Sequence, residues 1–199
     1  EQSLQKGQKG FKKGEQVFQK SQHANLFQIL SGVFQAHIEE MRARVFDARG
    51  RYAEAERSYN RARTMWQASM PSLRAAPNVP ATQIGIQNLD LLMAFEARAK
   101  LLQGKLVEGE ADIRRVLLSR LKANGKFHSE TAQFIDMLSR AMLEQGRYQD
   151  AEKLSRTSIE IFQSLGYADD ALQIIGSREQ LAGILSAQGR HIDVLKVFE

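Results

Sequence analysis

The chain has 199 residues, 43% of them hydrophobic, and a mean hydropathy of −0.40, values typical of a globular protein that buries a core. The absence of cysteine excludes disulfides and thiolate sites, and the net charge of +5 is small for a dedicated nucleic-acid binder. There is no apolar run of about 18 residues and no signal-peptide segment, so we expect no membrane association and a cytoplasmic location, with the periplasm as an open alternative.

Apolar side chains recur every three or four residues along most of the chain, which is the spacing of amphipathic helices. The aromatic and small residues of segment 11–18 recur 41 residues later in segment 52–59, so residues 1–22 are interpreted as part of a repeat. All three prolines lie between positions 71 and 80, which predicts a loop over residues 69–81. The predicted helices are 24–49, 52–68, 82–103, 105–122, 129–145, 147–165, 169–188 and 190–199.

One eight-residue motif occurs four times, with a glycine at its second position. The four copies are residues 49–56, 103–110, 145–152 and 188–195. The glycines are 54, 42 and 43 residues apart, and a recurring period in this range is typical of a solenoid. A glycine suits the turn between two helices because it adopts a left-handed conformation without steric cost. Five residues later Ala55, Gly109 and Ala151 are small, which predicts a close approach of the two helices, whereas Val194 is larger.

The segment LEQGRYQDAEKL, residues 143–154, resembles the centre of a tetratricopeptide repeat (TPR). The period near 42 is similar to the long-repeat variant in kinesin light chains and in bacterial signalling proteins. Segment 125–130 is similar to the link between such repeats, except that its proline is absent. The resemblance implies an all-α fold, a right-handed α-solenoid of antiparallel helix pairs, in one TPR domain over residues 1–199 that is a fragment of a longer protein. Its expected parts are a partial repeat at 1–22, repeats at 24–68, 82–122 and 128–165, and a truncated repeat at 168–199.

The sequence contains no catalytic, cofactor or metal motif, so we expect a protein that is not an enzyme. The four histidines do not have the spacing of a zinc site, and the chain contains neither a nucleophile elbow nor a full P-loop. The glycine-rich segment 7–14 follows no strand and has no Ser or Thr after its lysine, so it is interpreted as a turn between helices.

Three arginines stand six residues before a motif glycine, at Arg44, Arg98 and Arg140. In the TPR family this part of the first helix lines the concave groove, so the resemblance implies three guanidinium groups that face a bound partner. Guanidinium groups bind carboxylates, and the neighbouring Phe95 and Met137 offer apolar contacts. These five residues are the predicted binding site, and the predicted ligand is an acidic protein segment or peptide.

The same three arginines can equally be interpreted as ordinary exposed residues on a solvated helix surface. Glu40 precedes Arg44 by four residues and Asp136 precedes Arg140 by four, a spacing at which an acid pairs with its own helix's arginine. Arg98 follows Ala94 instead, which makes it the first choice for ligand contact. Both interpretations stay open at the level of sequence.

Three functions are compatible with these features. The first is a non-catalytic scaffold that binds a partner segment in the groove, and the second is the regulatory or sensor arm of a larger bacterial signalling protein, such as a CHAT protease or a transcription activator. The third is weak nucleic-acid binding through the lysines of segment 6–20, which lacks the interleaved aromatics of such sites. The exposed terminal repeats around Phe11 and Phe198 also predict a homo-oligomer.

Overall fold

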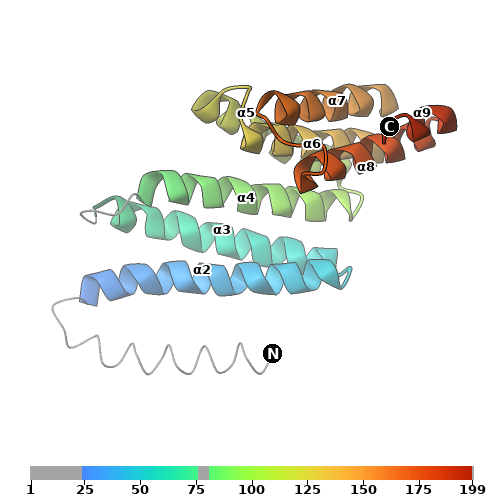
Figure 1. The fold of residues 1–199 in the computed structure, drawn as a ribbon. Helices are drawn as coiled ribbons and strands as arrows, with labels where there is room; N and C mark the ends of the chain where they lie inside the picture. The colour runs from blue at the N-terminus through green and yellow to red at the C-terminus, as the bar shows by residue number, and fades with distance from the viewer. Residues whose placement is uncertain (1–23, 76–80, 199) are drawn as a thin grey trace. The chain divides into compact units, whose positions relative to one another are not determined.

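The computed structural model describes the backbone of residues 24–75 and 81–198, with side chains described for residues 31–73 and 88–198. These residues form α-helices joined by turns, without a strand among them, which confirms the predicted all-α class (Figure 1). The helices are α2 (Ala24–Ala48), α3 (Tyr52–Ala75), α4 (Ala81–Leu101), α5 (Leu106–Asn124), α6 (Ser129–Glu144), α7 (Tyr148–Ser164), α8 (Leu172–Ala187) and α9 (His191–Leu195). Within the described part of the chain, no helix is both long and apolar enough to cross a membrane.

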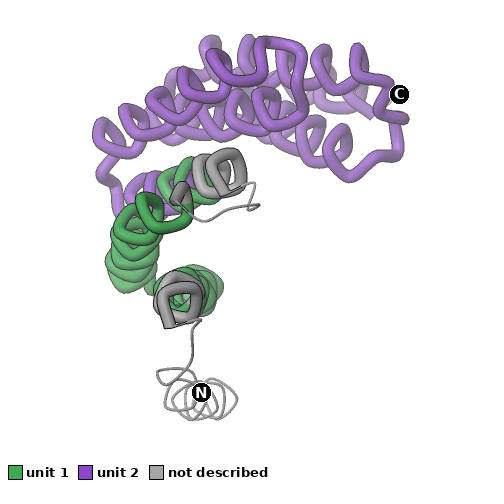
Figure 2. The backbone as a smooth tube through the Cα atoms, turned by 90° about the vertical axis from the view of Figure 1, so that its left-hand side faces the viewer, with its two compact units in different colours: residues 1–93 green, residues 94–199 purple. Residues whose placement is uncertain are grey.

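The chain divides into two compact units, coloured separately in Figure 2. Unit 1 is Glu1–Met93 and unit 2 is Ala94–Glu199, so unit 1 contains α2, α3 and most of α4, and unit 2 contains the end of α4 and all of α5 to α9. The single repeat domain and its right-handed superhelix stay predictions.

In unit 1, α2 and α3 form one helix pair around a small-residue core. Ala36, Ala43, Ala55 and Ala62 are fully buried, and Tyr59 is 1% exposed. Alanine at these positions allows the two helices to approach closely, and the aromatic ring fills the space that remains. This packing confirms the predicted pairing of the first two helices.

The predicted end of the second helix at residue 68 is wrong, because α3 continues to Ala75 with Pro71 inside it. A proline inside a helix removes one backbone hydrogen bond. Pro71 lies on the exposed side of α3, while Met70 and Leu73 on either side of it are 6% and 8% exposed. Their burial holds the last turns of the helix in place. Segment 76–80, with the other two prolines, lies outside the described residues.

The predicted glycine turn is confirmed, and its hydrogen bonds are those of a Schellman motif. Gly146 has a φ of 71°, its N–H donates to the Leu143 carbonyl at 2.9 Å, and the N–H of Arg147 donates to the Met142 carbonyl at 2.9 Å. Every copy of the motif repeats this pattern, with positive-φ glycines at positions 50, 104 and 189. Only glycine adopts this conformation without strain, so the turn explains the spacing of the motif.

The small residue five positions after the glycine lies where two helices touch. Ala151 is fully buried, and its carbonyl oxygen accepts a hydrogen bond from Ser139 Oγ of the preceding helix at 2.7 Å. A Cβ atom added to Gly109 would lie 2.7 Å from Leu101 Cγ and 2.9 Å from the Ala97 carbonyl oxygen. The expected close approach is therefore confirmed at Gly109 and at Ala151.

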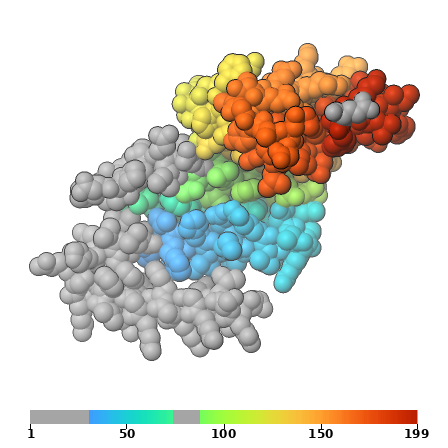
Figure 3. Space-filling view, viewed as in Figure 1, coloured from blue at the N-terminus to red at the C-terminus, as the bar shows by residue number. Residues whose placement is uncertain are grey.

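Two buried apolar clusters hold unit 2 together. The first joins residues of α4, α5, α6, α7 and α8: Ala97, Leu101, Ile113, Leu138, Ala141, Met142, Ala151 and Ile184. The second joins α6, α7 and α8: Ala132, Ile135, Ile161, Phe162 and Ile174. Each helix pair shares buried residues with the next, which is how a repeat protein builds a continuous core. Figure 3 shows the side chains of the C-terminal helices next to one another at its orange-to-red end.

The last two helices are shorter than predicted. α8 begins at Leu172 rather than 169, because residues 168–171 form a turn in which Ala171 N–H donates to the Ala168 carbonyl at 2.9 Å. α9 covers only His191–Leu195 rather than residues 190–199, and none of its residues is buried. Isolated short helices are marginally stable, and α9 has little packing to extend it.

Candidate functional site

The predicted binding residues are divided between the two units. Arg44 lies in unit 1, where its Nη2 donates to Glu40 Oε1 at 2.7 Å, so the predicted pairing on its own helix is confirmed. Phe95, Arg98, Met137 and Arg140 lie in unit 2. The row of three arginines across both units therefore stays a prediction.

The predicted pair between Asp136 and Arg140 has no hydrogen bond or close ion pair among the described residues, although the charge of Arg140 still acts on Asp136. The Asp136 carboxylate lies between helices and accepts hydrogen bonds from the hydroxyl groups of Ser158 on α7 and Ser177 on α8. Burial raises the pKa of Asp136 to about 6, while both serine hydroxyls and the charge of Arg140 act to lower it. The sequence interpretation failed because an acid four residues before an arginine gains only a few tenths of a kcal/mol from that pair, less than two hydrogen bonds between helices provide.

Arg140 is left exposed on α6. Among the residues that the structure describes, none forms a hydrogen bond or an ion pair with its guanidinium group. Arg98 is half-buried and interacts with other residues, so the sequence argument for preferring it no longer holds. Phe95 is also half-buried, and Met137 is half-buried against the first apolar cluster.

The sequence interpretation did not predict the hydrogen bonds that join consecutive helix pairs, which we call polar clamps. Glu152 on α7 accepts hydrogen bonds from Gln188 Nε2 at 3.2 Å and Arg190 Nη1 at 2.6 Å, both in the next turn. Glu110 on α5 is held in the same way by Gln145 at 2.7 Å and by Arg147. Gln, Arg and Glu stand at fixed offsets from the motif glycine, so the repeat itself carried a signal for these clamps.

The two clamp carboxylates have a lowered pKa. Burial alone would raise the pKa of Glu152, but hydrogen bonds from Arg156 and Gln188 and the charges of both neighbouring arginines bring it below the usual value. Glu110 behaves alike, with Gln145 and Arg114 as its main partners. Both carboxylates therefore stay ionised at neutral pH, and their role is to hold consecutive helix pairs together.

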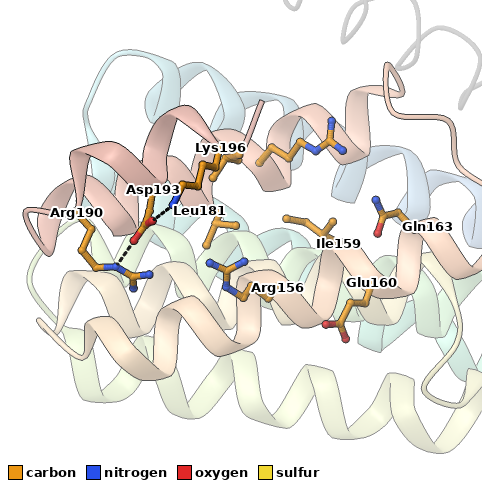
Figure 4. Close-up of a pocket in the computed structure, with 10 residues that line it drawn as sticks. Arg156, Ile159, Glu160, Gln163, Leu181, Arg190, Asp193 and Lys196 are labelled. Atoms are coloured by element: carbon orange, nitrogen blue, oxygen red, sulfur yellow. Dashed lines mark hydrogen bonds and ion pairs between the residues drawn. The ribbon is translucent and has the colours of Figure 1, made fainter. Parts of the chain in front are cut away.

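A hollow with a volume of about 400 Å³ opens between α7, α8 and α9 (Figure 4). Its apolar lining consists of Ile159, Leu181 and Val197. Its polar lining consists of Arg156, Glu160, Gln163, Arg178, Arg190, Asp193 and Lys196. The hollow is thus an apolar floor with a strongly charged rim.

The cations of this rim are held by acids of the same three helices and the turn before α8. Arg156 Nη2 and Arg190 Nη1 donate to opposite oxygens of Glu152 at 2.9 and 2.6 Å. Arg178 Nη2 donates to Asp169 Oδ1 at 2.7 Å, and the Asp169 side chain is 73% exposed. The rim is therefore ordered before any ligand arrives, and Arg178 is held by a partner that solvent reaches easily.

The described histidines have structural surroundings. His128 precedes α6, and its Nδ1 accepts a hydrogen bond from the Glu130 backbone N–H at 3.2 Å. His37 packs edge-on against Trp66 with ring centroids 6.0 Å apart, and His191 begins α9 as part of the turn motif. Within the described part of the chain, acidic and histidine side chains form no group that could hold a metal ion. His23 lies outside the described residues.

No family model matches the chain, and no curated protein has a matching sequence. Among solved structures, BtubC (BKLC) from P. vanneervenii is similar with a TM-score of 0.65 and 12% identity, over 98% of this chain and 70% of that chain. A candidate kinesin light chain from Podosopora anserina with nearly identical TPR-like repeats is similar with a TM-score of 0.63 and 17% identity, over 82% of this chain and 71% of that chain. The chain therefore has the fold of the TPR-like repeat proteins, as the resemblance of its turn motif indicated.

Proposed function

We propose that this protein is a non-catalytic interaction scaffold that binds an acidic segment of a partner protein on the exposed side of α6 and α8. The observation that carries the proposal is the environment of Arg140, a charged group on a rigid helix whose guanidinium has no ion pair among the described residues. The TPR-like fold supports it, because stacked helix pairs present extended surfaces suited to a peptide.

Arg140 belongs to a continuous stripe on α6. Gln133, Met137, Arg140 and Glu144 are exposed or half-buried and recur at intervals of four, three and four residues, which places them on one helical face. The opposite face of α6 is buried in the core. A ligand on this stripe would meet a flexible apolar side chain, Met137, one turn before the guanidinium.

The neighbouring helix offers room beside this stripe. Gly176 and Gly183 of α8 are exposed, and a Cβ atom added to either would meet nothing within 4 Å. Gly183 holds the position in its repeat that Arg140 holds in the previous one, and α8 is tied to α6 by a hydrogen bond from Gln180 Nε2 to the Asp136 carbonyl at 2.9 Å. A glycine allows close approach of a ligand backbone.

Replacing Arg140 with alanine is expected to weaken binding of an Asp- and Glu-rich peptide by about 1.5 to 3 kcal/mol, the value of a hydrogen bond to a charged group. The affinity is measured by fluorescence anisotropy of the labelled peptide. The same peptide with Asn and Gln in place of its acids should bind the parent protein as weakly as the acidic peptide binds the variant.

Arg115→Ala is the matched control. Arg115 lies on α5, the second helix of its pair, with a side chain 67% exposed and an ion pair of 3.1 Å to Asp112. Arg61, the control that the repeat pattern suggests, is unsuitable because its Nε donates to Glu39 Oε2 at 3.0 Å and so ties α3 to α2. Equal affinity of the parent and the Arg140 variant would contradict the proposal.

Gly183→Met is a second test, because it is expected to weaken peptide binding without destabilising the fold. The added side chain would occupy the space beside Arg140 and is expected to weaken binding of the acidic peptide about tenfold or more. The same change should raise the free energy of unfolding by up to about 1 kcal/mol, because glycine is unfavourable inside a helix. Denaturant unfolding and anisotropy on the same variant test both halves, and unchanged peptide affinity would show that the ligand does not pass over α8.

The other site residues and functions predicted from the sequence have less support than the site around Arg140. Arg44, Arg98 and Phe95 are proposed as further contacts of a longer partner segment, and the cytoplasm as its location. A regulatory arm of a larger bacterial signalling protein stays a prediction. Weak nucleic-acid binding also stays a prediction, because its lysines in segment 6–20 lie outside the described residues. A titration at several salt concentrations tests it, since phosphate binding has a steep salt dependence.

A further inference from the structure

The junction of α6, α7 and α8 contains three polar side chains, Asp136, Ser158 and Ser177, at positions that are apolar one repeat earlier. The motif glycines set the correspondence, so residues of α6 and α7 correspond to those 42 positions earlier, and residues of α8 to those 43 positions earlier. By this rule the counterparts are Ala94, Val116 and Phe134, which are 1%, 1% and 3% exposed. The repeat therefore packs without polar side chains at these positions.

The three polar side chains hold the Asp136 carboxylate in one direction. Ser158 and Ser177 are 0% and 2% exposed, and each hydroxyl donates to one oxygen of the carboxylate. A third hydrogen bond, from Gln180 Nε2 to the Asp136 backbone carbonyl at 2.9 Å, joins α8 to α6 at the same place. Buried polar groups cost free energy even when they are bonded to one another, and apolar residues fill the earlier junction, so packing alone does not explain this set.

The direction of the carboxylate matters to Arg140, which lies four residues later on α6. Within the described part of the chain, Asp136 makes no close ion pair with it. Glutamates on three other helices do pair with the arginine four residues later: Glu40 with Arg44 at 2.7 Å, Glu110 with Arg114 at 2.7 Å and Glu152 with Arg156 at 2.9 Å. The spacing of Asp136 and Arg140 favours the same pair, but the two serines direct the carboxylate toward α7 and α8.

We propose that Ser158 and Ser177 are positioning residues of the peptide site: they hold the Asp136 carboxylate away from Arg140 and so leave the guanidinium to a carboxylate of the partner segment. This role rests on the proposed function of Arg140. Without the two hydroxyls, the half-buried carboxylate would lose both donors, and a pair with Arg140 would compensate its charge. The Asp136 carboxylate would then compete with the ligand for the same guanidinium.

This competition depends on the charge of Asp136. Burial raises the pKa of its carboxyl to about 6, while the two hydroxyls from α7 and α8 and the charge of Arg140 on α6 act to lower it. On α5, the buried guanidinium of Arg120 is held by Glu130 of α6 at 3.2 Å. The carboxyl group is therefore ionised at about pH 7.5 and competes there, whereas a protonated carboxyl group at about pH 5 does not.

Ser158→Ala and Ser177→Ala together test this role, because either serine alone still holds the carboxylate. At about pH 7.5 the double variant is expected to bind the Asp- and Glu-rich peptide about tenfold more weakly than the parent, the effect of one charge-assisted hydrogen bond. Adding Asp136→Asn should restore the parent affinity, because no charge is left to compete. Fluorescence anisotropy measures all three proteins. A double variant that binds like the parent, or a loss that Asp136→Asn does not repair, would overturn the proposal.

The pH profile separates competition from a loosened junction. Lowering the pH to about 5 should restore the affinity of the double variant, while the triple variant with Asp136→Asn should show no such gain. A peptide with sulfonates in place of its carboxylates is used, because its own charge stays constant over this range. Equal pH profiles of the double and triple variants would overturn the proposal.

Ser155→Ala is the matched control. Ser155 is fully buried on α7, and its hydroxyl donates to the Ser177 carbonyl at 3.2 Å. This variant should keep the parent affinity, and a tenfold loss would mean that any weakening of the junction affects binding. Asp136→Asn alone should bind at least as tightly as the parent, since weaker binding would show that the carboxylate itself contacts the ligand. Helical circular dichroism checks that each variant is folded.

The free protein distinguishes this role from the proposed function. In NMR spectra without peptide, the Nε–H signal of Arg140 should shift in the double variant and return when Asp136→Asn is added. An unchanged signal would overturn the positioning role even where Arg140→Ala weakens peptide binding. A shifted signal together with no effect of Arg140→Ala on the peptide would instead overturn the proposed function, because the carboxylate would reach Arg140 while the peptide binds elsewhere.

Discussion

Tryptophan in place of Ala151 is expected to lower the free energy of unfolding of unit 2 by about 2 kcal/mol or more. Ala151 is fully buried in the first apolar cluster, and its own carbonyl oxygen is 2.7 Å from Ser139 Oγ. The backbones of α6 and α7 are therefore so close at this point that an indole ring has no space between them. It would force the helices apart and break contacts with Leu138 and Met142.

Denaturant unfolding followed by circular dichroism measures this loss. Gln149→Ala is the matched control, because Gln149 lies two residues earlier on the same helix and is exposed. Exposed substitutions of this kind change stability by about 0.5 kcal/mol or less. Equal losses at positions 149 and 151 would mean that the repeat phase set by Gly146 is wrong.

Asp136→Asn is expected to raise the free energy of unfolding above that of the parent protein, and to do so more at pH 7 than at pH 4. The folded-state pKa of Asp136 is about 6, against an ordinary value of 3.8, because burial penalises the charged carboxylate more than Ser158, Ser177 and Arg140 favour it. A raised pKa means that the contribution of the group to stability is present in full below about pH 4 and is lost as the pH rises through about 6. The difference in unfolding free energy between the Asn variant and the parent should therefore grow by about 3 kcal/mol over this window.

Urea unfolding of both proteins at several pH values between 4 and 7 measures this difference. The comparison cancels the contributions of other acids, which are common to both proteins. The charged neighbour in this site is Arg140 on the same helix, while α7 and α8 present the serine hydroxyls. A difference that stays constant with pH, or that shrinks as the pH rises, would show that the carboxylate is not the titrating group.

Ser158→Ala provides a second test of the same site. The Ser158 hydroxyl donates to Asp136 and lowers its pKa, so removing that donor should raise the pKa further and move the loss of stability to higher pH. The carboxyl carbon of Asp136 reports this shift in an NMR titration. An unchanged midpoint would mean that the hydrogen bond has no effect on the titration.

The helix pairs and their turns could be predicted because their determinants are local. Gly146 must take a positive φ, and Ala151 must be small, whatever the rest of the chain does. The spacing of apolar residues likewise follows from helix geometry alone. These local requirements recur with the motif, so the sequence was sufficient to predict an all-α repeat fold and its phase.

The ends of helices depended on burial that the local pattern does not reveal. Pro71 predicts a break, yet the buried side chains of Met70 and Leu73 outweigh the one hydrogen bond that proline removes. The apolar residues near α9 predict a long last helix, yet Ile192 and Leu195 are 74% and 68% exposed and supply little packing. In both places the outcome depends on how much apolar surface a neighbouring element covers.

The sequence by itself determined the repeat, its turn and the small residues at the helix contacts, because each follows from backbone geometry within one repeat. The tertiary structure alone decided the role of the Asp136 carboxylate. Asp136 and Arg140 are spaced to pair on one helix, but the serines that bind the carboxylate come from residues 22 and 41 positions away, and no local pattern reveals them. The exposed guanidinium of Arg140 and the charged hollow beside α9 both result from such contacts between helices, which form only when the pairs are packed together.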